Sequence, residues 1–127
     1  MEFTFNNKSS RDFNIKIKKS NHLSIPRKKL EFIEVQGRTD NLIVDEGARE
    51  MLDIEIEAYI DCRNEDTYSY ALRLDEWLNG VNGYSNLTFN DGIKLKAIFV
   101  GQIDFNEIVN NFNEILLQFK AYREGDL

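Results

Sequence analysis

The sequence predicts a mainly β fold, an antiparallel β-sandwich or barrel of about seven strands with one α-helix. Two observations support this class. Several segments alternate apolar and polar residues with the period of two that is typical of a half-buried strand, and only one segment shows the helical period of about 3.6. Because runs of strands interrupted by a single helix do not give the βαβ alternation of a parallel sheet, we expect an antiparallel arrangement.

The N-terminal third is expected to form short strands. Phe3 to Phe5 is the first, and a second carries Phe13, Ile15 and Ile17 in alternation with polar residues. Lys29 to Val35 is a third candidate, and the Gly37 that follows supplies the backbone freedom for a turn.

The clearest strand spans residues 52–60. Its apolar residues occupy every second position, so one face is predicted to lie in the core and the other, which carries Glu55 and Glu57, to lie in solvent. The inward positions are Leu52, Ile54, Ile56, Ala58 and Ile60.

Residues 67–79 form the one expected helix. Asp66 or Thr67 can cap its first amides, and Gly80 can take the left-handed conformation that closes many helices. We expect the apolar stripe to pack on strand 52–60. The stripe consists of Tyr70, Ala71, Leu74, Trp77 and Leu78.

Two hairpins are predicted after the helix. In the first, Leu87 to Phe89 turns through Asn90-Asp91-Gly92 into a strand of Ile93 to Ala97. In the second, Ile98 to Phe105 pairs with Phe112 to Tyr122 across an Asn110-Asn111 turn.

Composition limits the function classes. A chain of 127 residues with one cysteine is expected to be a single domain, residues 1–127, without an internal disulfide, and no segment has a signal or membrane-span pattern. Residues 1–40 carry a balance of +4 and the remainder −10, within a net charge of −6. The basic clusters Lys16-Lys18-Lys19 and Arg27-Lys28-Lys29 lack interleaved aromatic residues, so neither a nucleic-acid nor a membrane partner is expected.

No group of residues predicts chemistry. His22 is the only histidine and Cys62 the only cysteine, and the two do not make a metal-ligand set, so neither a metal nor a cofactor is expected. Glu55 and Glu57 have a spacing that would suit two-carboxylate glycoside chemistry, but a solvated strand face explains them better. Phosphate-binding loops and nucleophile elbows are absent from the sequence, and we do not expect an enzyme.

Several short motifs occur in an order that resembles one known family. They include Ser9-Ser10-Arg11-Asp12-Phe13, Gly37-Arg38-Thr39-Asp40 with Asp45-Glu46-Gly47, Trp77-Leu78, and Leu87-Thr88-Phe89 followed by Asp91 and Ala97. Together they cover nearly the whole chain. In this order they resemble the N-terminal domain of the distal tail protein (Dit) of long-tailed bacteriophages, whose members commonly carry a second, C-terminal domain. The resemblance implies that residues 1–127 correspond to the N-terminal domain alone.

The resemblance implies a structural role in a phage or prophage tail tip or baseplate. It implies a homohexameric ring with an open channel that links the tail tube to the tip, and contacts with the tail tube, tape-measure and tail-lysin-like proteins. The protein would be made in the host bacterial cytoplasm and end in the virion tail. Other readings remain open: a related tail component such as a tube or tail-completion protein, or a β module that binds a ligand or carbohydrate near Tyr59, Tyr68 and Tyr84.

The uneven charge and the resemblance together predict a head-to-tail interface. In a ring each subunit uses two different surfaces, and the positive and negative parts of the chain are candidates for them. Arg38 is singled out because a guanidinium can bind a neighbour's carboxylate in a bidentate manner, although a bond within its own turn is equally compatible with the sequence. The predicted interface residues are Lys16, Lys18, Arg27, Lys28, Arg38, Asp45, Glu46, Glu50 and Asp53.

Overall fold

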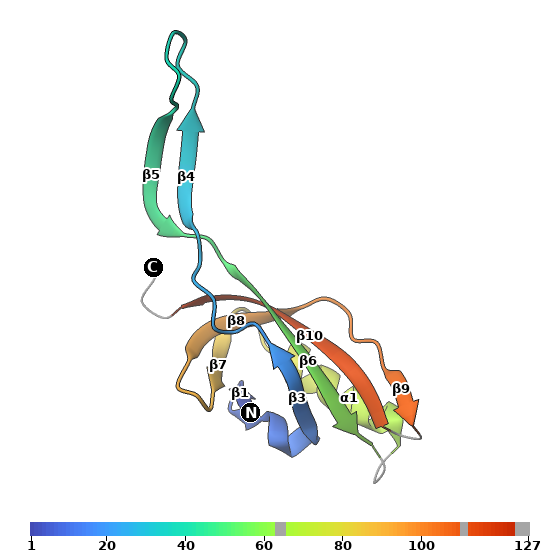
Figure 1. Ribbon diagram of the computed structural model, residues 1–127. Coiled ribbons are helices and arrows are strands. Elements are labelled where there is room, and N and C mark those ends of the chain that lie inside the picture. The colour runs from blue at the N-terminus through green and yellow to red at the C-terminus, as the bar shows by residue number, and fades with distance from the viewer. Residues whose placement is uncertain (63–65, 110–111, 124–127) are drawn as a thin grey trace.

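The computed structural model describes residues 1–62, 66–109 and 112–123. Within them the chain forms an eight-stranded antiparallel sheet, one α-helix and a separate two-stranded ribbon that projects from the body (Figure 1). The mainly β class with a single helix is therefore confirmed. The expected number of strands was about seven, and the strands that the sequence did not indicate are Lys8–Ser9, Leu42–Arg49 and Asn106–Val109.

The main sheet has the strand order β2-β1-β7-β8-β10-β6-β3, with β9 also paired to β10, and the ribbon is formed by β4 and β5. The strand bounds are β1 Phe3–Phe5, β2 Lys8–Ser9, β3 Ile15–Ser20, β4 Lys28–Ile33, β5 Leu42–Arg49, β6 Leu52–Asp61, β7 Ser85–Phe89, β8 Lys94–Val100, β9 Asn106–Val109 and β10 Phe112–Arg123.

Strands β6 and β10 form the longest pairing in the sheet. They pair over their length, from Phe112 opposite Asp61 to Ala121 opposite Leu52. On β6 the predicted alternation is confirmed, because its five inward residues are buried and Glu55 is exposed. On β10 Ile115, Leu117, Phe119 and Ala121 are buried in the same way.

The sheet curls so that strands far apart in its order approach each other. Phe5 of β1 packs on Phe119 of β10 with ring centroids 5.1 Å apart, although β7 and β8 separate those strands in the sheet order. Phe3 lies 6.3 Å from the same ring in an edge-on arrangement. This curvature gives one continuous core inside a partly closed barrel.

Helix α1, Thr67–Asn79, covers the core with the predicted stripe. The indole of Trp77 stacks on Phe13 at 4.2 Å and on Phe3 at 5.7 Å, and its Nε1 donates a hydrogen bond of 2.7 Å to the carbonyl of Phe5. The hydroxyl of Tyr70 donates to the carbonyl of Phe13 at 2.5 Å. Because these bonds satisfy the polar atoms of two large aromatic side chains, both can lie in the core.

The N-terminal end of the helix has the predicted cap, whereas the C-terminal end does not have the predicted conformation. Asp66 is the N-cap, and its Oδ2 accepts from the amide of Ser69 at 3.2 Å. Gly80 has φ −80° rather than the predicted left-handed conformation. A Cβ at Gly80 would collide with the carbonyl oxygen of Glu76, so close backbone approach, not positive φ, explains a glycine here.

Two strand predictions need correction, and one turn prediction is not tested. Phe13 ends a 3-10 turn, η1 Ser10–Phe13, and strand β3 begins only at Ile15. Residues 93–97 and 98–105 are not two strands, because no turn residue separates them and the chain continues as β8, which pairs with β7 on one side and β10 on the other. The predicted Asn110-Asn111 turn lies outside the described residues.

Candidate functional site

The projecting ribbon is the most unusual surface of the molecule. We call residues 28–49, which comprise β4, β5 and the turn between them, the arm. Its two strands pair only with each other within the described chain, and the arm leaves the body at the end where β3 and β6 would otherwise continue (Figure 1). The sequence predicted a strand near β4, but not that it would lie outside the sheet.

The arm exposes apolar side chains that have no core to enter. Every residue of β4 is exposed, and six apolar side chains of the arm have between 38% and 59% of their surface in solvent. Isolated apolar residues are common on surfaces, but a contiguous group is typical of an interaction site. The six are Leu30, Phe32, Ile33, Leu42, Ile43 and Val44.

Strand register divides these residues between the two faces of the arm. Phe32 lies opposite Ile43 and Leu30 opposite Asp45, so Leu30, Phe32 and Ile43 share one face. Ile33 lies opposite Leu42 and Glu31 opposite Val44, which places the second apolar group on the other face. A strand pair that covers a core has one apolar and one polar face, whereas both faces of the arm are partly apolar.

Hydrogen bonds to backbone carbonyls define the arm at its root and its tip. At the root, the amide of Glu50 donates to the carbonyl of Arg27 at 2.7 Å, and the guanidinium of Arg49 donates to the carbonyl of Pro26 at 3.0 Å. At the tip, Gly37 has φ +84°, and the amide of Arg38 donates to the carbonyl of Val35 at 3.2 Å. The arm is therefore a defined hairpin held at both ends.

Charged residues of the arm make contacts within the chain. Arg38 makes a two-pronged contact with Asp40, with Nη2 2.8 Å from Oδ2, and this hydrogen bond lowers the pKa of Asp40. In this structure Arg38 is therefore bonded within its own turn, which is the second of the two possibilities that the sequence left open. Asp45, Glu46 and Gly47, which the resemblance set beside the Gly-Arg turn, lie inside β5, where Gly47 has φ +74° at a shift in register.

The predicted interface residues do not form two opposite poles. Arg27 and Glu50 lie side by side at the root of the arm, and Lys28, Arg38, Asp45 and Glu46 all lie on the arm itself. The other three are on the body. There Lys18 pairs with Glu114 at 3.2 Å, which raises the pKa of Lys18, and Asp53 pairs with Lys120 at 2.6 Å, while Lys16 lies on β3 beside a surface pocket.

His22 has partners that the sequence did not reveal. It is 5% exposed, its ring stacks on Phe89 at 3.8 Å, its Nε2 lies 2.7 Å from Asp91 Oδ2 and its Nδ1 2.8 Å from Ser20 Oγ. Asp91 is 69 positions away, so no local motif could indicate the contact. We call these three polar residues the clasp, because they join the end of β3 to the β7–β8 turn.

The clasp has the residue types of a hydrolase triad but not the arrangement of one. Ser20 Oγ also accepts a hydrogen bond from the amide of His22 at 3.3 Å, which ties the hydroxyl to its own loop. The His22 ring is covered by Phe89, and the surface pocket described below is lined by other residues. The contacts join two parts of the curled sheet and present no nucleophile to a substrate.

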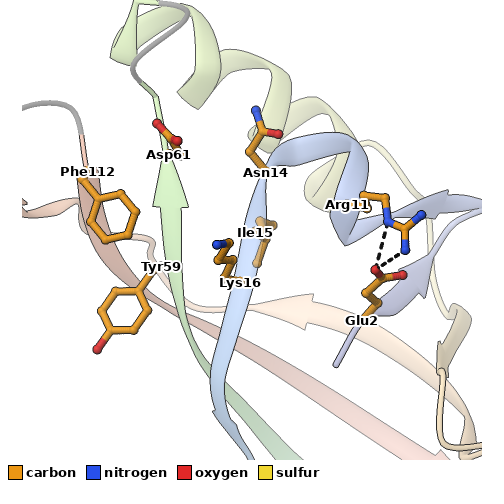
Figure 2. A pocket seen from close by; sticks show the side chains of 8 residues that line it. All are labelled: Glu2, Arg11, Asn14, Ile15, Lys16, Tyr59, Asp61 and Phe112. Carbon is orange, nitrogen blue, oxygen red and sulfur yellow. Dashed lines mark hydrogen bonds and ion pairs between the residues drawn. The ribbon is translucent and has the colours of Figure 1, made fainter.

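A pocket of about 310 Å³ lies on the surface between β3, β6 and η1 (Figure 2). On one side the rings of Tyr59 and Phe112 lie 5.8 Å apart and within 18° of parallel. On the other side Arg11 makes two hydrogen bonds to Glu2, at 2.9 and 2.5 Å. Its volume is at the small end of the range for ligand sites.

The three tyrosines of the ligand-binding alternative do not converge. Tyr59 borders this pocket near the end of β6, whereas Tyr84 packs against Tyr122 and its hydroxyl lies 3.9 Å from the sulfur of Met51, which precedes β6. Tyr68 is 70% exposed on α1. A site shared by all three is therefore not present in this structure.

Other candidates for chemistry have ordinary surroundings. Cys62 is fully buried in the core, as expected of a packed residue, and Glu55 lies on the solvent face of β6. In the described part of the chain, no three His, Cys, Asp or Glu side chains are grouped so as to hold a metal ion. Helices of the length and apolarity needed to cross a bilayer are likewise not found among the described residues.

Comparison with solved structures gives a clear likeness in fold. The chain is similar to the Dit protein of phage SPP1, described as a paradigm of the hub adsorption apparatus in phages that infect Gram-positive bacteria. The TM-score is 0.76 at 13% sequence identity, over 97% of this chain and 52% of the SPP1 protein. The chain thus spans about half the length of that protein. No protein-family model matches the sequence, and a search of curated proteins also finds no match.

Proposed function

We propose that this chain is a structural subunit of a phage or prophage tail tip, a distal tail protein that assembles into a homohexameric ring and links the tail tube to the tip. The observation that carries the proposal is the likeness to a tail hub protein over 97% of the chain. The order of sequence motifs leads independently to the same family. On this proposal residues 1–127 are one ring-forming domain, located in the virion tail, with other tail proteins as partners.

The arm supports assembly on physical grounds. Its exposed apolar side chains gain free energy if a partner covers them, by roughly 25 cal/mol for each Å² of apolar surface removed from water. Closed rings require two different surfaces on one subunit, and a projecting arm supplies one of them. Of the nine predicted interface residues, those at the arm and its root remain the best candidates: Arg27, Lys28, Arg38, Asp45, Glu46 and Glu50.

Mass measurement over a range of protein concentrations tests the proposal. We expect light scattering to show a hexamer, or a rise toward one as concentration increases, and negative-stain images to show rings with an open centre. A stable dimer with two-fold symmetry that buries the arm would contradict ring formation, because a two-fold interface closes at two copies.

A ligand-binding module is the second candidate, favoured by the pocket beside Tyr59 and Phe112. Stacked aromatic side chains bordered by charged groups are a surface on which a sugar ring can pack. Titration with cell-wall saccharides, followed through NMR signals near Tyr59, distinguishes the candidates. Saturable shifts lost in Phe112→Ala, in a protein that remains monomeric, would favour the ligand-binding role.

A further inference from the structure

We propose that Asn82 is a site of spontaneous deamidation, and that the fold selects it over an identical dipeptide at the end of helix α1. The sequence contains two Asn-Gly pairs, Asn79-Gly80 and Asn82-Gly83, and both asparagines are exposed. Asparagine is among the residues that are chemically labile in proteins. The reaction consumes only water, so this inference does not depend on the proposed function.

Deamidation at an Asn-Gly pair is an attack of the backbone on the side chain. The amide nitrogen of the glycine loses its proton and bonds to the side-chain carbonyl carbon of the asparagine, and ammonia leaves. Water then opens the resulting cyclic imide at either carbonyl, which gives aspartate or isoaspartate. Glycine favours the attack, because without a Cβ its nitrogen is open to approach and its backbone is free to rotate. The reaction therefore requires a free side chain and a peptide unit that can turn toward it.

Asn79 meets neither requirement, because it is the last residue of α1. Its Nδ2 donates a hydrogen bond of 2.7 Å to Oδ1 of Asp75, one helical turn earlier. Gly80 approaches the helix so closely that a Cβ placed on it would collide with the carbonyl oxygen of Glu76. The adjacent Leu78 is buried in the core and anchors the last turn. Attack by the nitrogen of Gly80 therefore requires the end of the helix to open first.

Asn82 meets both requirements. It lies in the connection between α1 and β7, and within the described residues neither its side chain nor the amide nitrogen of Gly83 makes a hydrogen bond. Gly83 has φ +82°, and a Cβ placed on it would have open space around it. The attacking nitrogen can thus approach the side chain of Asn82 without the loss of a contact in the fold.

The modification changes the charge and the length of this connection. Aspartate or isoaspartate adds a negative charge to a chain whose formal net charge is already −6. Isoaspartate also adds a methylene group to the backbone between α1 and β7. Leu78 and Leu87, which lie on either side of the connection, are buried in the core, so the change is confined to the loop.

Mass spectrometry of the folded protein tests the inference. After incubation at mildly alkaline pH, digestion and tandem mass spectrometry measure both asparagines in one sample, since ammonia lost and water gained give a defined mass increase. We expect Asn82 to react roughly tenfold faster than Asn79, because Asn79 reacts only when the helix end opens. The rate at Asn82 should rise with pH, because the attacking nitrogen has to lose its proton.

A synthetic peptide of residues 74–94 is the control without a fold, and in it both asparagines should react at similar rates. In the protein, Asn82→Gln should abolish the fast reaction, because glutamine would have to close a larger ring, whereas Asn79→Gln should leave it unchanged. Equal rates at Asn79 and Asn82 in the folded protein would overturn the inference. A rate at Asn82 far below that in the peptide would also overturn it, since the folded loop would then protect this site as well.

Discussion

At the scale of single residues, His22 shows how a buried polar side chain can close a curled sheet. Its ring covers Phe89 while its two nitrogens reach Ser20 and Asp91, so that burial leaves no ring nitrogen without a partner. The sequence identified His22 as the only histidine and indicated no local ligand set around it, and it could not place Asp91 beside it. Pairing between segments 69 positions apart depends on the curvature of the whole sheet.

The clasp predicts a dependence of stability on pH. The hydrogen bond from His22 lowers the pKa of Asp91 from its ordinary value of 3.8. A lowered pKa in the folded state means that folding favours the carboxylate, so this stabilisation is complete above the ordinary value and is lost as the pH falls through the lowered one. We expect Asp91→Asn to lower the free energy of unfolding at neutral pH and to differ little from the unchanged protein in strong acid.

Chemical denaturation of both proteins across this pH range measures the effect. Asp104→Asn is a suitable control, since Asp104 is exposed and only accepts a hydrogen bond from the nearby Gln102. A difference between Asp91→Asn and the unchanged protein that stays constant down to strong acid would show that the carboxylate is not the source of the effect. His22→Ala should cost about 2 kcal/mol through lost packing and hydrogen bonding.

At the scale of elements, the spacing of apolar residues was sufficient to predict a helix or strand where that element covers the core. The bounds of α1 and the inward face of β6 were predicted correctly, because burial forces apolar residues into the period of the backbone. Gly80 was assigned the wrong conformation, since the sequence shows a glycine but not whether it serves positive φ or close approach. The arm was missed as a separate unit because its strands have apolar residues on both faces and so resemble ordinary core strands.

Substitutions on the two faces of β6 test the assignment of the core. Ile56→Ala or Leu74→Ala should cost roughly 2 to 5 kcal/mol, because both side chains are fully buried and the cavity left behind cannot collapse completely. Glu55→Ala should cost far less, since Glu55 is exposed. Equal losses in urea denaturation at the buried and exposed positions would contradict the arrangement of strand faces described here.

At the scale of the whole molecule, the fold sets some basic residues of the first forty positions beside acidic residues from distant parts of the chain. Residues 1–40 are basic and the rest acidic, yet the fold sets Lys18 beside Glu114, and Arg38 is paired with Asp40 in its own turn. Sequence predicts how much charge a segment carries, whereas the spatial pattern follows from strand pairing between distant segments. Ion pairs within one copy therefore engage Lys18, Arg38 and Asp53, which the sequence assigned to contacts with a neighbouring copy.

This arrangement predicts how assembly responds to salt. Exposed ion pairs each contribute only about 0 to 1 kcal/mol and are screened by salt, so raising the ionic strength should weaken association by a small factor. Arg38→Glu should also have a small effect, because Arg38 already has a partner at the tip of the arm. Phe32→Ser removes apolar contact area that salt does not screen, and it should weaken association more than either change. Sedimentation equilibrium at low and high salt compares the three, and complete dissociation by salt alone would mean that charge, not the apolar arm, holds the copies together.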